Sequence, residues 1–322
     1  MYKDLTNIVP EQQSFEKEMK GWDQRMFENI IGISSGWRKI EYNWRDTALY
    51  ALAVGAEKDD LQYFYEKDKR GMKAIPTFAS VQYYSAVNNE PQQPFPYPAN
   101  YYASDAMSKE VGYEVNRGFH MGYEMIMHKP IDPIKGTFVF NNYVDKLYDR
   151  GEGKGTDLEV KNMVYDEGGD LICENTSYHR FPNVGGWGGP APVKIKVDYP
   201  DREPDYVVDS YIGPVQNALY RLTGDTNESH VNPEAALKQD PKGVFMQGLS
   251  SLGFACRMAI KAVIPGEPER MKRIYVQMRA KAFPDTPVQL RAWKTGEKKI
   301  AFKYVDLNTE IAILDNCEFE WE

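Results

Sequence analysis

The segment YRLTGDTNESHVNPE, residues 220–234, concentrates side chains that can move a proton. Asp225, Asn227 and His230 lie close together in it, and His230 is one of only 4 histidines in the chain. Such a compact group can converge on one water molecule, and an Asp–His pair is a workable acid–base device near neutral pH. A helix and a glycine follow, so backbone N–H groups at a helix N-terminus are expected nearby.

The same composition is also typical of a turn, because Gly, Asp, Asn and Ser favour turns and helix N-caps. Residue types alone therefore favour a polar turn between packed elements. Other candidate motifs fail on spacing: GLSSLG (248–253) is not a nucleophile elbow, and GEGKGT (151–156) is not a phosphate loop. The remaining histidines, His120, His128 and His179, lack metal-ligand spacing, so we expect them to be structural and expect no metal.

Composition narrows the class of protein. The chain has 322 residues, of which 42% are hydrophobic and 27% charged, which suits a soluble globular protein of two domains. A net charge of −8 disfavours nucleic-acid binding. No apolar stretch is long enough for a membrane span. The 3 cysteines form no CxxC motif, which favours a reducing compartment. The first residues show no signal-peptide pattern, and the last four, FEWE, are not a peroxisomal targeting signal. We therefore expect a cytoplasmic location.

Two similar successions of elements follow one another along the chain. Helix-like spacing in residues 1–35 and 42–56 precedes period-two strand patterns in 119–180, and a helix predicted over 243–260 precedes further strands. LQYFYEKD (61–68) is predicted as a short strand and the proline-rich 88–102 as a long loop. This order predicts an α+β protein in which each half packs an antiparallel sheet on one long helix. The predicted parts are an N-terminal helical extension (1–35), a first half (36–182), a linker (183–205) and a second half (206–322).

YRLTGDTNESHVNPEAA resembles the signature of the MaoC-like, type 2 (R-specific) enoyl-CoA hydratases, a double hot-dog family. That signature reads roughly Y-x-L-S-G-D-x-N-P-L-H-[IV]-D-P-x-x-A. The family's helix-opening glycine has its counterpart in VFMQG, where Gly248 follows His230 at the family's spacing of 18 positions. The likeness covers most of the chain, including HMGYEMIMHKPIDPIKGTF, RFPNVGGWGGP and AFPDTPVQLRAWKTGEKKIAF.

The resemblance implies reversible addition of water to a trans-2-enoyl-CoA, giving an (R)-3-hydroxyacyl-CoA. Asp225 and His230 would activate the water, Asn227 would orient the water or the histidine, and the backbone N–H of Gly248 would stabilise the enolate-like thioester oxygen. CoA enters only as part of the substrate, and no cofactor is implied. The first half lacks a second D-x-N-x-x-H, so we expect one active site per chain, with the first half forming an acyl tunnel lined or lidded by 88–102.

The chain departs from the family pattern at four positions: Glu228, Ser229, Asn232 and Gln247 replace the family's Pro, Leu, Asp and His. These changes bear on the substrate range and on the direction or type of reaction. Further residues near the motif are weaker candidates for substrate binding, with cations for the CoA phosphates among them: Tyr220, Glu228, Lys238, Lys242, Gln247, Arg257 and Lys261.

Three alternatives stay open. The first is a dehydratase acting on carrier-protein-bound or bulky ring-bearing acyl thioesters, for which the same residues would serve. The second is a non-catalytic hot-dog subunit that binds acyl thioesters, which the substitutions around the motif favour and the retained Asp225, Asn227, His230 and Gly248 oppose. The third is a thioesterase, which the motif spacing opposes. Chains of this family often dimerise, so we expect a homodimer.

Overall fold

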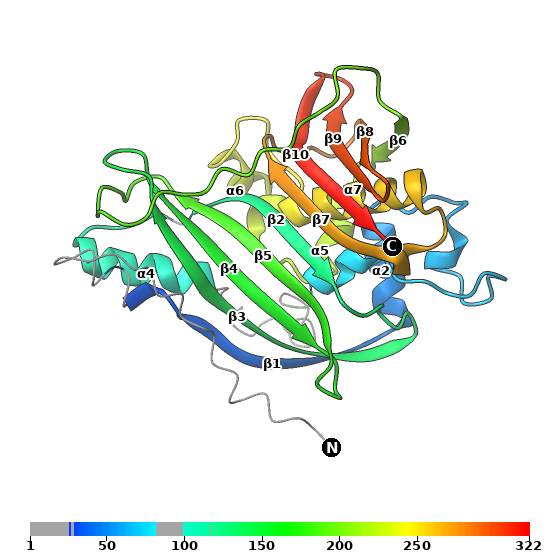
Figure 1. Ribbon diagram of the computed structural model, residues 1–322, viewed down its shortest axis with the longest axis horizontal. Helices are drawn as coiled ribbons and strands as arrows, with labels where there is room; N and C mark the ends of the chain where they lie inside the picture. Colours follow the sequence, from blue (N-terminus) through cyan, green and yellow to red (C-terminus); the bar gives the residue numbers. More distant parts are fainter. Residues whose placement is uncertain (1–25, 27–28, 82–98, 117) are drawn as a thin grey trace.

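A single ten-stranded antiparallel sheet forms the framework of the protein (Figure 1). The computed structural model describes residues 26, 29–81, 99–116 and 118–322. In spatial order the strands are β1 (Ser34–Asn43), β3 (Lys135–Asp149), β4 (Thr156–Tyr165), β5 (Leu171–Phe181), β2 (Phe119–Met127), β7 (Met271–Met278), β10 (Ile311–Trp321), β9 (Lys299–Asp306), β8 (Thr286–Gly296) and β6 (Tyr206–Ile212).

The sheet consists of two halves with the same strand order, which meet where β2 pairs with β7. Reading inward from each edge, the first, third, fourth, fifth and second strands of a half lie side by side. This is the double hot-dog arrangement, with the two half-sheets joined into one. Because β2 and β7 run antiparallel, with Gly122 opposite Gln277 and Ile126 opposite Arg273, each end of the seam joins the start of one strand to the end of the other.

The second half is built on one long buried helix, α7 (Gly248–Val263). Every residue from Leu249 to Ile260 is buried, as expected for a helix that is apolar on most of its surface. Short elements lead into it and out of it: α5 (Gln216–Arg221), the 3₁₀ turn η3 (Glu228–His230), α6 (Pro233–Leu237) and the 3₁₀ turn η4 (Pro268–Arg270). The predicted helix starts five residues early, because 243–247 form an extended approach to Gly248.

Helical cover of the first half is divided among several short elements: α2 (Trp44–Ala53), η1 (Leu61–Tyr63), η2 (Pro76–Ser80) and α4 (Ala99–Val111). Among the described residues, the longest helix of this half is α4, which has 13 residues against 16 in α7. The expected pairing of one long helix with each half therefore describes the second half better than the first. The strand predicted at 61–68 is wrong, because that segment forms η1 and turns.

Two apolar clusters fill the interior. The larger joins both halves and includes Phe138, Phe140, Val164 and Cys173 of the first half together with most of α7. The smaller lies under α4 and includes Val144, Leu158, Val160 and Phe181. The inner face of the first half-sheet thus packs against two separate apolar clusters, which lie towards opposite ends of its strands.

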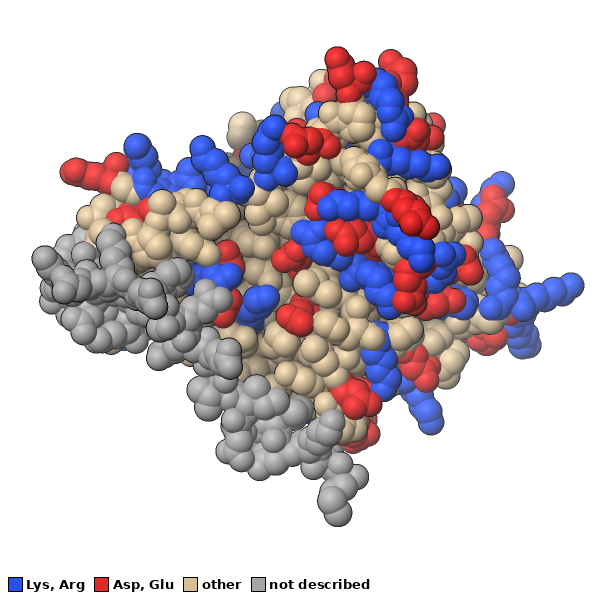
Figure 2. Space-filling view, in the orientation of Figure 1, with Lys and Arg blue, Asp and Glu red and all other residues tan. Residues whose placement is uncertain are grey.

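Ion pairs cross the seam on the outer face of the sheet. Arg273 of β7 lies 2.7 Å from Glu124 of β2, and also contacts Glu318 and Glu320 of β10 at 2.8 and 3.0 Å. Figure 2 shows Lys and Arg interleaved with Asp and Glu over this part of the molecule. The alternation of sign gives this face no continuous basic surface of the kind that nucleic-acid binding uses.

Several predicted segments differ from, or lie outside, the described structure. The helical extension predicted for 1–35 is mostly outside the described residues, and β1 already begins at Ser34. Most of the loop predicted at 88–102 is also outside them, and its last residues open α4. The segment 183–205 has no helix or strand, yet Trp187 in it is fully buried and donates to Thr156 Oγ1 at 2.9 Å. No described helix is long and apolar enough to cross a membrane.

Candidate active site

The loop between α5 and α7 is shaped by side chains that cap its own turns. Asp225 Oδ1 accepts from the backbone N–H of Asn227 at 3.1 Å, and Asn227 Oδ1 accepts from that of Ser229 at 3.1 Å, which caps η3. Asn232 caps α6 in the same way through Glu234. The polar turn and the candidate site are thus the same structure, because the side chains that cap the turn also fix the position of His230.

His230 is buried and held in one orientation. Its Nδ1 lies 3.0 Å from the carbonyl oxygen of Phe245, and its ring meets the Phe245 ring edge-on at 4.9 Å. Asn217 donates to its backbone carbonyl at 2.7 Å. Because a carbonyl oxygen can only accept, Nδ1 carries the proton and the neutral ring presents its lone pair at Nε2. That atom is the one available to take a proton from water.

Burial moves both members of the Asp–His pair towards their neutral forms. It raises the pKa of Asp225, although His230, the Asn227 N–H and Arg221 oppose the shift. It lowers the pKa of His230, although Asp225 and the Phe245 carbonyl oppose the shift. The attraction between the Asp225 carboxylate and the His230 ring opposes both shifts, so each side chain favours the charged form of the other.

The N-terminus of α7 completes the candidate site. Its first residue, Gly248, follows Gln247, whose side chain makes no cap and instead donates to the Asn217 carbonyl at 3.2 Å. The first-turn N–H groups of α7 are therefore not used by a side-chain cap and can meet developing negative charge. A Cβ on Gly248 would lie 2.9 Å from Met278 Sδ and 3.6 Å from His120 Nδ1, so the flexible end of Met278 and the His120 ring both lie close to the start of α7.

The other candidate residues fall into two groups. Tyr220 and Gln247 are buried beside the loop, whereas Glu228, Lys238 and Lys242 are exposed around it. These positions are compatible with roles in substrate binding.

Arg257 and Lys261 require a correction. Arg257 is only 1% exposed and contacts Ser210 Oγ at 2.6 Å, the Val54 carbonyl at 3.1 Å and Asp60 at 3.3 Å. It lies nine residues into α7, roughly 13 Å along the helix axis from Gly248. Lys261 is paired with Glu57 at 2.9 Å. Arg257 therefore ties α7 to the first half, and it is not available to bind a CoA phosphate.

Sequence analysis missed a histidine cluster. His120, expected to be structural, lies beside Gly248 at the positive end of α7. Ser177 Oγ is 2.9 Å from His120 Nε2 and 2.8 Å from His179 Nε2, and the two rings stack at 5.0 Å. Only the pairing of β2 with β5 and β7 brings these residues to α7. The only sequence signal was the scarcity of histidine itself.

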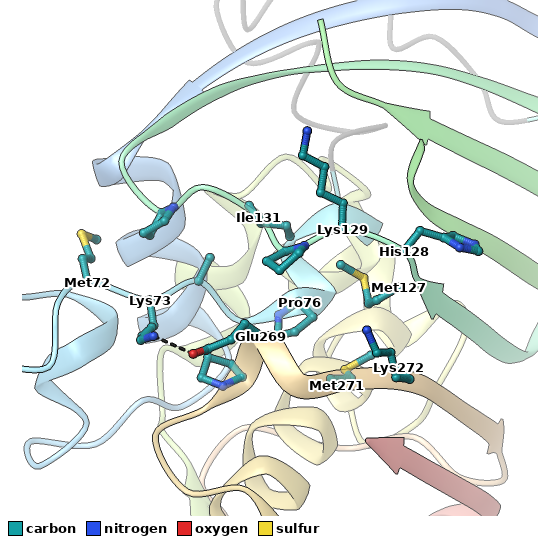
Figure 3. A pocket seen from close by; sticks show the side chains of 14 residues that line it. Met72, Lys73, Pro76, Met127, His128, Lys129, Ile131, Glu269, Met271 and Lys272 are labelled. Atoms are coloured by element: carbon teal, nitrogen blue, oxygen red, sulfur yellow. Dashed lines mark hydrogen bonds and ion pairs between the residues drawn. The ribbon is translucent and has the colours of Figure 1, made fainter. Parts of the chain in front are cut away.

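A cavity of about 240 Å³ lies at the opposite end of the β2–β7 seam (Figure 3). It is lined by the end of β2 (Met127), the start of β7 (Met271) and the start of η2 (Pro76), and the Lys73–Glu269 ion pair spans one side of it. By the repeat of strand order, this position is the first half's counterpart of the Gly248 site. It holds no Asp–His pair of the kind seen in the second half.

Comparison with known proteins agrees with this geometry. Residues 40–179 match the model of the MFE-2 hydratase 2 N-terminal domain, and residues 196–314 match that of the MaoC like domain. The peroxisomal enoyl-CoA hydratase 2 of Arabidopsis thaliana is 28% identical over 81% of this chain and 85% of its own length. The 3-hydroxyacyl-thioester dehydratase Y of Mycobacterium tuberculosis is 27% identical over 90% and 93%.

Among solved structures, a MaoC-like dehydratase from Phytophthora capsici superimposes with a TM-score of 0.77. It shares 28% identity and covers 92% of this chain and 98% of that one. Fold, site and relatives together define a hydro-lyase built on a double hot-dog. The chain belongs to the MaoC-like, enoyl-CoA hydratase 2 family.

Proposed function

We propose that the protein catalyses the reversible hydration of a trans-2-enoyl-CoA to an (R)-3-hydroxyacyl-CoA. One observation carries this proposal: the Nδ1 of His230 is fixed by the carbonyl of Phe245, three residues before the helix start at Gly248. The base His230, the carboxylate of Asp225 and the start of α7 then all belong to one segment of the chain, residues 225–248. The family relatives named as enoyl-CoA hydratases support the substrate class.

In the proposed mechanism a water molecule is held between Asp225 and His230. Its oxygen bonds to C3 of the enoyl group as one of the pair accepts its proton, and the electrons of the C2–C3 double bond move towards the thioester carbonyl. The N–H of Gly248 stabilises the resulting oxyanion, and the Asp225–His230 pair then delivers a proton to C2, which leaves the pair with as many protons as it had at the start. Loss of one such backbone donor typically costs roughly 10²–10³ in rate. Asn227 acts as a positioning residue, because it caps the turn that carries His230.

The reverse reaction is dehydration of a 3-hydroxyacyl thioester. The Mycobacterium tuberculosis relative is named for that direction. The same Asp225–His230 pair serves both directions, so a dehydratase working on a CoA or carrier-protein thioester is the second candidate function. Initial rates measured from the enoyl thioester and from the 3-hydroxyacyl thioester show which of the two directions the protein catalyses faster.

The test follows absorbance of the enoyl-thioester band with short, medium and bulky trans-2-enoyl-CoAs. We expect wild type to hydrate at least one of them to an (R)-3-hydroxy product. Asp225→Asn and His230→Gln should lose most of kcat with little change in KM, whereas Glu234→Gln, at an exposed position of the same segment, is the matched control. Normal turnover in both dyad variants would exclude the mechanism. Binding without turnover by wild type would instead favour a non-catalytic acyl-thioester-binding subunit.

Location and assembly remain predictions. We propose a cytoplasmic homodimer, although the Arabidopsis thaliana relative is named as peroxisomal. Light scattering on the purified chain tests the dimer, and cell fractionation tests the location. A monomer, or enrichment in peroxisomes, would overturn the respective prediction.

A further inference from the structure

The inner face of the first half-sheet carries a band of polar side chains between its two apolar clusters. On β5, Cys173, Asn175, Ser177, His179 and Phe181 alternate and so share one face. The outermost two of these belong to different apolar clusters, and the three between them are all polar. The polarity is therefore confined to the middle of the strand, where a core-facing strand would ordinarily be apolar.

The band continues across two neighbouring strands. Asn162 of β4 is the register partner of Asn175, and Asn142 of β3 is the register partner of Asn162. These three side chains are 5%, 1% and 7% exposed, respectively. We call the whole set the polar belt, and it comprises His120, Asn142, Asn162, Asn175, Ser177 and His179.

Part of the polar belt is used to hold the fold. Asn142 Oδ1 accepts from the Ala99 N–H at 2.7 Å and so caps α4, and Asn175 Nδ2 donates to the Ala79 carbonyl at 3.3 Å. Three buried atoms have no such role: within the described part of the chain, Asn162 Oδ1, Asn175 Oδ1 and His179 Nδ1 have no hydrogen-bond partner. A buried polar atom left in that state costs roughly 1–3 kcal/mol, which a hydrogen bond to a bound water or to a polar group of a ligand would recover.

The polar belt begins at the candidate active site. His120 Nδ1 lies 3.6 Å from the position of a Cβ on Gly248, and Ser177 joins His120 to His179. From His179 the belt runs back along β5 to Asn175, a distance of about 13 Å at the usual rise of a strand. The hydrogen-bonding groups of the polar belt therefore lie in the first half at increasing distances from Gly248.

We propose that the polar belt binds the acyl group of the substrate, and that the preferred acyl group carries a hydroxyl or another hydrogen-bond donor along its chain. The inference rests on the proposed function, because that function places the thioester at Gly248. A plain alkyl chain would bury the three unpartnered atoms without pairing them. A site of that kind rejects the analogue that lacks the polar group.

Binding measurements test the preference without requiring turnover. Calorimetry with wild type compares decanoyl-CoA with 6-, 8- and 10-hydroxydecanoyl-CoA, all saturated and therefore unreactive. We expect at least one hydroxylated ligand to bind about ten-fold more tightly than the plain one, or better. If none of the three binds more tightly than decanoyl-CoA, the proposal is wrong.

Variants locate the preference in the belt. The double variant Asn162→Leu, Asn175→Leu should bring the ratio of the two affinities close to one, because both free carbonyl oxygens are removed. Asn141→Leu is the matched control: Asn141 neighbours Asn142 on β3, but its side chain pairs with Ser34 on the other face of the sheet. His179→Phe is a second belt variant in case the double variant does not fold. An unchanged ratio in a folded belt variant would overturn the assignment.

Crotonyl-CoA separates this inference from the proposed function, because its acyl chain is too short to reach Asn162. Hydration of crotonyl-CoA that depends on Asp225, without any preference for hydroxylated ligands, would leave the function in place and exclude the polar subsite. A preference for hydroxylated ligands with no hydration of any enoyl-CoA would leave the subsite in place and exclude the hydratase.

Discussion

His230 and Phe245 are joined by a 3.0 Å hydrogen bond from Nδ1 to the backbone carbonyl, and this contact connects the proposed base to the start of α7. The Phe245 segment is itself fixed, because the next N–H, that of Met246, donates to the Ala282 carbonyl at 2.8 Å. The imidazole and Gly248 are therefore held by one short piece of chain. Such rigidity is what an acid–base group needs if its geometry is to be ready before substrate arrives.

The acid limb of the pH profile of kcat/KM should depend on Arg221, a cation that does not touch the reacting atoms. Arg221 opposes the raised pKa of Asp225 and contributes to the lowered pKa of His230. Replacing it with Met should raise both pKa values, so the acid limb of kcat/KM should move to higher pH. The measurement is a pH profile of kcat/KM for wild type, Arg221→Met and the control Glu234→Gln, whose side chain is exposed. A limb that stays in place in Arg221→Met would contradict the electrostatic coupling described above.

Stability should fall in mild acid because two partly buried histidines, His120 and His179, are held in neutral form. Burial lowers the pKa of His120 from 6.5 to about 4 and puts that of His179 well below 6.5. Since the unfolded chain binds these protons first, their contribution is complete above pH 6.5 and is lost as pH falls towards 4. For His120 alone this is roughly 1–3 kcal/mol.

Urea unfolding at several pH values measures this loss. His120→Gln can still hydrogen-bond to Ser177 but cannot take up a proton, so its stability should depend less on pH between 6.5 and 4. Equal slopes for the variant and the wild type would show that His120 is not held neutral by the fold.

Alanine substitutions at two glycines of α7, Gly248 and Gly253, should affect activity and stability differently. A Cβ at Gly253 would lie 2.3 Å from Val54 Cγ1 and 2.8 Å from Tyr50 Oη, and neither neighbour can move easily in a packed interior. Gly253→Ala should therefore destabilise the fold by roughly 1–3 kcal/mol. At Gly248 the nearest atoms are the flexible end of Met278, so Gly248→Ala should cost less stability.

Turnover should show the opposite order. Displacing Met278 and crowding His120 disturbs the N-terminus of α7, so Gly248→Ala should lower kcat more than Gly253→Ala does in the folded fraction. Thermal melts together with initial rates at a temperature where both variants are folded provide the comparison. Equal kcat values would mean that the start of α7 does not act on the reacting thioester.

Local patterns predicted the parts of the fold that depend on local geometry. The period-two pattern in 119–180 correctly predicted strands such as β4, in which Leu158, Val160, Asn162 and Val164 share the buried face. The spacing of Leu249, Leu252 and Cys256 correctly predicted a buried helix. The capping residues around Asp225 explain why that motif is equally a turn and a candidate site, since one set of hydrogen bonds does both.

Contacts between distant segments were beyond those patterns. His120 reaches Gly248 only because β2 pairs with β7, and nothing near His120 in the sequence encodes that pairing. The strand β6 was also missed, because its alternation is short and its partner β8 lies about 80 residues away. Arg257 looked like a cation near the motif, but its charge is neutralised by Asp60, which is 197 residues distant.

Arg257 supplies the clearest stability prediction. Its guanidinium is buried against Asp60 and Ser210, so Arg257→Ala would leave a carboxylate of the first half without its cation. Breaking a buried pair from one side typically costs roughly 3–5 kcal/mol. Lys261→Ala, which removes the half-exposed partner of Glu57, should cost only about 0–1 kcal/mol.

Denaturant unfolding measures both changes, and KM for the acyl-CoA in the folded protein separates packing from binding. Because Arg257 ties α7 to the Val54 carbonyl, its loss should loosen the contact between the halves while leaving KM unchanged. A large rise in KM with little loss of stability would return Arg257 to the substrate site and would require a different path for the CoA group across this surface.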